Sequence, residues 1–220
     1  MALIQNKLVV WDWNGTLVDD SFVFVDIMNS FLSSYSLKTI SLKNYRDYFC
    51  FPVKEYYSSL GFQLTEEEFE ALSISFIKQY KKKMFKPLLK TNILSVLNYV
   101  ESSGCSQIVV SAQEQGLLNK SIAHYGLKKY FSKALGLTNN LAVSKAALAK
   151  KAVAPFIKRG GKVLFVGDTL HDLEVARFVG ASCCLVSWGH NSARRFSNKK
   201  ADVVFSVSDL SSFIKNFIMY

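Results

Sequence analysis

The stretch Val9-Val10-Trp11-Asp12-Trp13-Asn14-Gly15-Thr16-Leu17 is an apolar run that ends in a carboxylate and a turn. An apolar run without polar alternation predicts a buried strand. Such a strand has no structural use for Asp12 at its carboxyl end, because an unpaired buried charge costs free energy. A metal ion, a phosphate group or a nucleophilic reaction would give that carboxylate a use. The stretch therefore predicts a chemical site at the end of the first strand.

The composition is that of a chain that folds around a sizeable core. Half of the 220 residues are hydrophobic and three are proline, which excludes a disordered protein. No apolar run approaches the ~20 residues that span a bilayer. Residues 1–7 lack the segments of a signal peptide. The four cysteines form no C-x-x-C pair, so we expect reduced thiols in a cytoplasmic protein. Without a long apolar run, we expect no membrane partner.

The net charge of +10 favours anionic partners. Much of the excess lies in lysines between residues 78 and 86, on one amphipathic helical pattern. A solvated helix face is the preferred interpretation, because no binding motif or basic–aromatic interleaving supports nucleic-acid recognition. We therefore expect a small phosphorylated partner and no nucleic acid. No pattern indicates the oligomeric state.

After residue 87, short apolar segments alternate with helical patterns. The strands are expected at residues 107–110, 162–166, 182–186 and 202–205, in addition to the first strand. The helices are expected at residues 91–103, 114–126, 143–158, 170–180 and 208–218. This alternation predicts an α/β fold with a doubly wound, Rossmann-like parallel sheet.

Residues 18–86 differ, because their aromatic side chains recur at helical spacing and no clear strand is present. Thr65 followed by three glutamates predicts a helix start. The simplest organisation is an α/β core domain of residues 1–17 and 87–220. An all-helical cap domain, residues 18–86, would be inserted after the first strand.

Polar residues at strand ends are the candidate site, because ligands of open α/β sheets bind there. Asp12, Ser111 and Asp168 end predicted strands, and Asp172 starts the next helix. Converging carboxylates favour a hard cation, and the expected ion is Mg²⁺. Ser111, a lysine and the backbone N–H groups of the turn after Asp12 would hold phosphate oxygens. Asp12 would then be an in-line nucleophile that forms an aspartyl-phosphate.

Each of these residues also has a structural interpretation. Asn14-Gly15 between apolar residues is a hairpin signal. Thr169 and Asp172 fit a capping box, which explains Asp172 but not Asp168. Ser111 could simply end a strand. Three histidines, His124, His171 and His190, are expected on the surface or in loops.

The motifs resemble those of the haloacid-dehalogenase-like superfamily, in particular its small phosphatases of the phosphoglycolate-phosphatase type with a helical cap. The first motif, D-x-D-G-T, stands here as Asp12-Trp13-Asn14-Gly15-Thr16. Ser111 matches the second motif, and Lys145 in Ala142-Val143-Ser144-Lys145 best matches the third. The fourth, G-D-x-x-x-D, matches residues 167–172. The resemblance covers essentially the whole chain, including the position and size of the cap.

The resemblance implies a ligand set. Mg²⁺ would be bound by Asp12, the backbone carbonyl of Asn14 and Asp168, with Asp172 in or near the shell. Phosphate would be held by Ser111, Lys145 and turn amides, those of Trp13 and Gly15. Arg46 could reach from the cap to a substrate carboxylate or phosphate. A structural salt bridge of Arg46 and a solvent-exposed Lys145 are the alternatives.

Asn14 departs from the motif, whose second Asp protonates the leaving oxygen and later deprotonates the attacking water. An amide can do neither, and loss of general acid–base catalysis typically costs ~10²–10⁴ in rate. The sequence predicts a Mg²⁺-dependent phosphatase-type hydrolase that acts on a small phosphorylated metabolite, slowly or on esters with good leaving groups. The alternative is a phosphate-ligand-binding or regulatory protein with little turnover. A weaker alternative is another transfer reaction through the same nucleophile.

Overall fold

Six parallel strands form one sheet in the computed structural model, which describes residues 6–138 and 145–220. Their order is β3-β2-β1-β4-β5-β6, and each neighbouring pair runs parallel. The doubly wound sheet predicted from the sequence is confirmed. The strands are β1 (Lys7–Trp11), β2 (Ser106–Glu114), β3 (Lys133–Leu137), β4 (Lys162–Gly167), β5 (Ser182–Val186) and β6 (Asp202–Val204).

The strand order reverses beside β1, which lies between β2 and β4. Trp11 is in register with Val109 of β2 and with Val166 of β4. The N–H of Asp12 continues this pairing by donating to the carbonyl of Val166, 2.9 Å away. Ligands of open α/β sheets bind at such a switch point, outside the carboxyl ends of the strands. The sheet therefore places Asp12 in the expected crevice.

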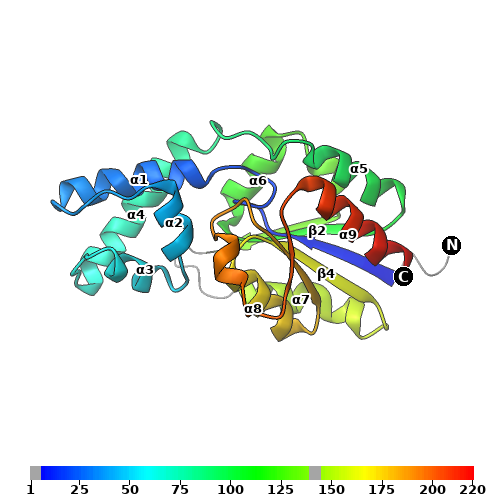
Figure 1. Ribbon diagram of the computed structural model, residues 1–220. Coiled ribbons are helices and arrows are strands. Elements are labelled where there is room, and N and C mark those ends of the chain that lie inside the picture. Colours follow the sequence, from blue (N-terminus) through cyan, green and yellow to red (C-terminus); the bar gives the residue numbers. More distant parts are fainter. Residues whose placement is uncertain (1–5, 139–144) are drawn as a thin grey trace.

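Apolar side chains cover both faces of the sheet, since successive strand residues point to opposite sides. Val9 and Trp11 face one hydrophobic cluster, which the helices α5, α6 and α9 cover. Leu8 and Val10 face the other cluster, under α7 and α8 (Figure 1). These helices are α5 (Ile93–Ser102), α6 (Gln115–His124), α7 (Lys145–Ile157), α8 (Leu170–Val179) and α9 (Val207–Met219).

The strands and helices predicted after residue 87 are all found. The structure also contains β3, which was not predicted. Its sequence, Lys-Ala-Leu-Gly-Leu, lacks the β-branched and aromatic residues that marked the others. As an edge strand, β3 pairs with β2 alone. The predicted start of α7 at residues 143 and 144, with residue 142 of the third motif, lies outside the described residues. Residues 1–5, on which the signal-peptide prediction rests, also lie outside them.

Four helices occupy the segment between β1 and residue 84 and lie together at the left of Figure 1. They pack around a hydrophobic cluster of their own, to which Leu117 of α6 also belongs. Thr65 forms the predicted capping box with Glu68. We call these four helices the helical unit: α1 (Ser21–Ser34), α2 (Leu42–Tyr48), α3 (Val53–Ser59) and α4 (Glu66–Lys83). The division into two domains at residues 18 and 86 stays a prediction.

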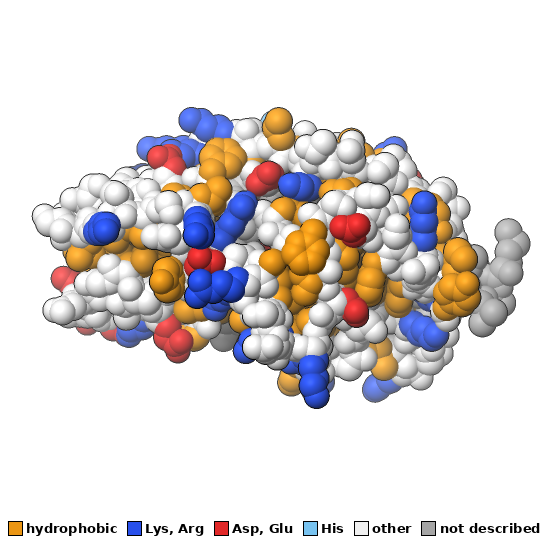
Figure 2. Space-filling model, in the orientation of Figure 1, with side chains coloured by type: hydrophobic (Ala, Val, Ile, Leu, Met, Phe, Trp, Pro, Cys, Tyr) orange, Lys and Arg blue, Asp and Glu red, His pale blue; other side chains and the backbone are white. Residues whose placement is uncertain are grey.

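The lysines near the end of α4 are largely exposed, as a solvated face requires. On the face shown in Figure 2, Lys and Arg side chains are spread among acidic and apolar ones. Within the described residues, no helix combines the length and apolar character needed to cross a bilayer. All four cysteines are free.

Candidate active site

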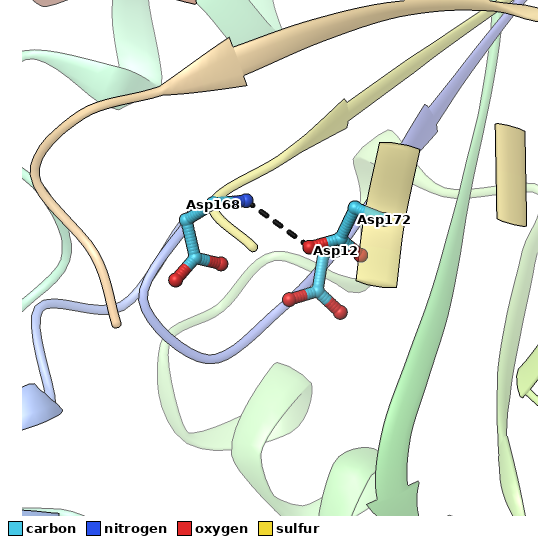
Figure 3. Close-up of side chains that lie close together, drawn as sticks. All are labelled: Asp12, Asp168 and Asp172. Carbon is cyan, nitrogen blue, oxygen red and sulfur yellow. Dashed lines mark hydrogen bonds between the residues drawn. The ribbon is translucent and has the colours of Figure 1, made fainter. Parts of the chain in front are cut away.

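Asp12, Asp168 and Asp172 meet at the carboxyl ends of β1 and β4 (Figure 3). Asp12 directly follows β1, Asp168 directly follows β4, and Asp172 lies in the first turn of α8. One oxygen from each carboxylate lies within 4.8 Å of the other two. The structure thus brings together the three carboxylates that the sequence singled out.

Close backbone approach and two hydrogen bonds position Asp168. Gly15 has a φ of +73°, and a Cβ there would lie 2.3 Å from an oxygen of Asp168, so this turn requires glycine. The Thr16 hydroxyl donates to one Asp168 oxygen at 2.8 Å, and the N–H of His190 donates to the other at 2.6 Å. The motif residues Gly15 and Thr16 therefore hold a carboxylate from a distant strand.

Asp172 has two roles, because its two oxygens have different partners. Oδ2 accepts from the N–H and the hydroxyl of Thr169, at 2.9 and 2.7 Å, and from the N–H of Asp168 at 3.2 Å. This is the capping box expected at the start of α8. Oδ1 accepts from Lys145 at 2.5 Å. Capping and participation in the site therefore coexist in one side chain.

Lys145 is buried at the start of α7, and its ammonium lies 2.5 Å from Asp12 Oδ1 as well as from Asp172. Burial raises the pKa of Asp12 and of Asp168. Asp172 is equally buried, but Lys145 outweighs that effect and holds its pKa below the ordinary value. When all three carboxylates are ionised, the single ammonium of Lys145 leaves two negative charges. That excess and the all-oxygen donor set fit a hard divalent cation.

Ser111 lies within β2, three residues before its end, and is buried. Its hydroxyl accepts from the N–H of Gln113 at 3.1 Å. The side-chain amide of Gln113 has no hydrogen-bond partner among the described residues, although it is only 9% exposed. Both residues line the same cavity as Asp12 and Lys145. The sequence prediction missed Gln113; its position two residues beyond Ser111, on the same side of the strand, was the available signal.

Asn14 is held by its neighbours on the side of the helical unit. Its side-chain amide donates to Asp20 Oδ2 and to the Tyr80 hydroxyl, the latter at 2.6 Å. Tyr80 in turn donates to Asp20 at 3.1 Å, and the N–H of Gly15 donates to Asp20 at 2.9 Å. Position 14 therefore faces a buried carboxylate. The hairpin interpretation is wrong, because both neighbours of β1 are parallel and α1 follows the turn.

His190 is in a loop, as predicted, but it is buried rather than on the surface. Its Nδ1 lies 2.8 Å from the Tyr45 hydroxyl, and its Nε2 lies 3.2 Å from Asp20. Burial by itself lowers the pKa of His190, but Asp20 and nearby carboxylates outweigh this and raise it. The loop follows β5, so the rule that found Asp12 and Asp168 could also have found His190.

Three predicted phosphate ligands, the Arg46 side chain and the backbone N–H groups of Trp13 and Gly15, are not among the residues that line the cavity. The Arg46 guanidinium donates to the Ser21 hydroxyl at 3.0 Å and to the Trp188 carbonyl at 2.7 Å. The Trp13 side chain lies in the hydrophobic core. The N–H of Gly15 donates to Asp20 and to the Val18 carbonyl. These residues shape the surroundings of the site, and their contact with phosphate stays a prediction.

A cavity of about 580 Å³ opens between these residues and the helical unit. We call its polar side, with Asp12, Asn14, Ser111, Gln113, Lys145 and His190, the core wall. The opposite side, formed by lining residues from Phe24 to Tyr80, is the helical wall; nine of its residues are aromatic. The volume is that of a site for a small molecule.

The chain belongs to the haloacid dehalogenase-like hydrolase family, whose model matches residues 9–186. It is 22% identical over 208 residues to phosphoglycolate phosphatase 1 of Pseudomonas aeruginosa, covering 90% of this chain and 75% of the relative. It is 24% identical to phosphoglycolate phosphatase of Pseudomonas savastanoi pv. phaseolicola, covering 94% and 78%. The crystal structure of a predicted phosphatase from Clostridium acetobutylicum shares the fold, with a TM-score of 0.79, 20% identity and coverage of 96% and 99%. The resemblance expected from the motifs is confirmed.

Proposed function

We propose that this protein is a Mg²⁺-dependent phosphoric monoester hydrolase that acts on a small phosphorylated substrate. The observation that carries the proposal is the meeting of three carboxylates and one buried lysine beside the cavity. The names of the phosphoglycolate phosphatase relatives support the same reaction class. Asp12, Asp168, Asp172 and the carbonyl of Asn14 would hold the ion, which would offset the charge of the phosphate group.

Asp12 is the nucleophile in this proposal. Its carboxylate oxygen attacks phosphorus, the bond from phosphorus to the ester oxygen breaks, and an aspartyl-phosphate forms. Lys145 and Ser111 hold phosphate oxygens, and Lys145 also orients Asp12, which it contacts at 2.5 Å. Water then attacks phosphorus and releases Asp12. The helical unit acts as a cap that limits the access of bulk water during transfer.

The amide of Asn14 limits this reaction, because it can neither protonate a leaving oxygen nor deprotonate water. Turnover is therefore slow or restricted to esters whose alcohols leave without an acid. The contacts of Asn14 with Asp20 and Tyr80 also favour a second candidate, a phosphate-binding or regulatory protein with little turnover. In that case the site binds phosphorylated ligands without releasing product.

A panel of phosphate esters with and without Mg²⁺ tests the proposal. The wild-type protein should release phosphate from at least one ester, and Asp12→Ala should abolish this release. Circular dichroism shows whether the variant is folded. Equal release by Asp12→Ala would refute the nucleophile. Metal-dependent binding of an ester that yields no product in long incubations would support the binding protein instead.

A further inference from the structure

The helical wall offers an apolar and largely aromatic surface to whatever enters the cavity. The aromatic rings come from all four helices and from the segment between α2 and α3, and they include Phe24, Phe49, Phe51, Tyr57, Phe69 and Phe76. Met28, Val53 and Ile77 fill positions between them. Apolar and aromatic surfaces of this kind bind apolar bodies, and rings above all, by area burial and ring stacking.

The positively charged side chains at or near the helical wall, Lys54 and Arg46, already have partners within the protein. Among its described lining residues, Lys54 is the one charged side chain. Its ammonium pairs with Glu66 and lies 5.9 Å from the ring centre of Phe69. Arg46 points to Ser21 and Trp188. A short substrate with a second anionic group would therefore have to compete with these partners, whereas an apolar body would not.

The chemistry of the core wall restricts the leaving group. Asn14 supplies no proton, so the departing oxygen must be stable as an anion. A phenol has a pKa of about 10, whereas that of water is about 15.7. An aryloxide therefore leaves without an acid far more readily than the anion of an alkyl alcohol. The two walls thus impose the same requirement for different physical reasons.

We propose that the substrate is a phosphate monoester of an aromatic alcohol, with its ring against the helical wall and its phosphate at Asp12. This proposal rests on the hydrolase function above and names its substrate class. An oxygen of Asp12 bonds to phosphorus while the bond to the aryl oxygen breaks. The electron pair leaves on the aryloxide, which then takes a proton from solvent. The unpartnered amide of Gln113 offers hydrogen bonds to the polar end of this ligand.

The second step, hydrolysis of the aspartyl-phosphate, is slow for every substrate, because it does not involve the leaving group. Water bonds to phosphorus, the bond from phosphorus to Asp12 breaks, and the proton of the water passes to a phosphoryl oxygen, because Asn14 cannot accept it. Formation of the aspartyl-phosphate from an aryl ester is therefore faster than its hydrolysis. The proposal predicts a burst of aryl alcohol, of one equivalent per site, followed by a slower steady state.

Three esters separate the two requirements: 1-naphthyl phosphate, phenyl phosphate and phosphoglycolate. The two aryl esters have similar leaving groups and differ in apolar area. We expect kcat/KM to be about tenfold higher for the naphthyl ester, from the burial of its second ring. Both aryl esters should have a higher kcat/KM than phosphoglycolate and should show the burst in stopped-flow measurements. A preference for phosphoglycolate, or equal values for the two aryl esters, would overturn the proposal.

Two isoleucines of α4 provide a matched pair of variants. Ile77 lines the cavity, whereas Ile74 is 56% exposed and does not. Ile77→Asn should lower kcat/KM more for naphthyl than for phenyl phosphate, because it places a polar group against the larger ring. Ile74→Asn should leave both values unchanged. Equal effects of the two variants on the naphthyl-to-phenyl ratio would contradict the assignment of the helical wall.

Calorimetry with phosphonates, which are not hydrolysed, distinguishes failure of this proposal from failure of the hydrolase function. The ligands are 1-naphthylmethylphosphonate and phosphonoacetate, both with Mg²⁺. If no ester is turned over but the naphthyl ligand binds at least tenfold more tightly than phosphonoacetate, the hydrolase proposal fails and the preference for an aromatic ligand is supported. If esters are turned over but phosphonoacetate binds more tightly, the hydrolase proposal is supported and the aromatic substrate class is wrong.

Discussion

The two walls of the cavity differ in chemical character: one is polar and charged, and the other is apolar and aromatic. The core wall consists of polar and charged side chains near the strand ends and at the start of α7, where Lys145 pairs with Asp12 and Asp172, so in the proposed function it holds a phosphate group by charge and direction. The helical wall consists mainly of rings from the helical unit, so in the proposed function it selects its ligand by shape and apolar area. If the proposed function holds, the reaction and the choice of substrate depend on separate parts of the chain. Asn14 lies at their junction, because it contacts Tyr80 of the helical unit and Asp20 before α1.

The largest expected effect comes from giving position 14 a carboxylate. Asn14→Asp alone would place that carboxylate against Asp20 and replace an attractive contact by repulsion. The double variant Asn14→Asp/Asp20→Asn restores a hydrogen bond between the two side chains. We expect it to raise kcat/KM for alkyl phosphates by ~10²–10⁴, because it supplies the missing acid and base. Phosphate release measured on alkyl and aryl esters checks this.

The same double variant distinguishes the contributions of the two walls to substrate preference. The preference for aryl over alkyl leaving groups should shrink, because departure no longer depends on the stability of the anion. The preference for naphthyl over phenyl phosphate should persist, because the helical wall is unchanged. If the double variant leaves the alkyl-to-aryl ratio at its wild-type value, Asn14 does not limit the reaction.

The next effect tests the charge balance of the core wall. Lys145→Met leaves the buried carboxylates of Asp12 and Asp172 without their ammonium, and such a loss typically costs about 3–5 kcal/mol of unfolding free energy. Added Mg²⁺ should recover part of this, since it binds the native state preferentially. Urea unfolding with EDTA and with Mg²⁺ measures both changes. Lys151→Met, an exposed position on the same helix, should change neither. Equal losses for the two variants would contradict the buried charge balance.

The core wall could largely be predicted from the sequence, whereas the helical wall could not. Asp12 and Asp168 follow apolar strands, and parallel strands bring their carboxyl ends to one edge of the sheet. Lys145 required the family resemblance, because a helix lysine has no distinctive pattern. For the helical unit, periodicity predicted helices with aromatic residues. It could not tell that Phe76 lines the cavity, because that depends on how separate helices pack.

Asp20 and Tyr80 were missed at the site for a physical reason. They are far apart in the chain, and both contact Asn14. The strand-end rule could have found His190, but not its contact with Tyr45 of the helical unit. Such networks join segments whose proximity is set by tertiary packing, which local propensity does not encode. The edge strand β3 was missed for a different reason, since its short sequence lacks the usual strand formers.

A smaller effect compares two buried tyrosines of the helical unit. The Tyr80 hydroxyl bonds to Asn14 and Asp20, whereas that of Tyr56 has no partner among the described residues. Tyr80→Phe should cost about 1–3 kcal/mol of unfolding free energy, because it leaves buried polar groups unpaired. Tyr56→Phe should be neutral or stabilising. Chemical denaturation of both variants measures the difference, and equal costs would contradict the role of Tyr80 at the junction.

The smallest effect uses one motif that occurs on both sides of the cavity. Thr65 caps α4 in the helical unit, and Thr169 caps α8 at the core wall, each within a capping box. Either Thr→Ala change should cost about 1 kcal/mol of unfolding free energy, because each removes one cap hydrogen bond.

Their effects on activity should nevertheless differ. Thr169 also donates its hydroxyl to Asp172, which contacts Lys145, so Thr169→Ala should lower the affinity for Mg²⁺ and phosphate release. Thr65→Ala should lower neither, because the side chain of Thr65 bonds to Glu68 of its own helix. Metal titration and phosphate release measured on both variants provide the comparison. If Thr65→Ala weakens metal binding as much as Thr169→Ala does, the two walls are coupled through the stability of the fold, and their functions are not separable by position in the chain.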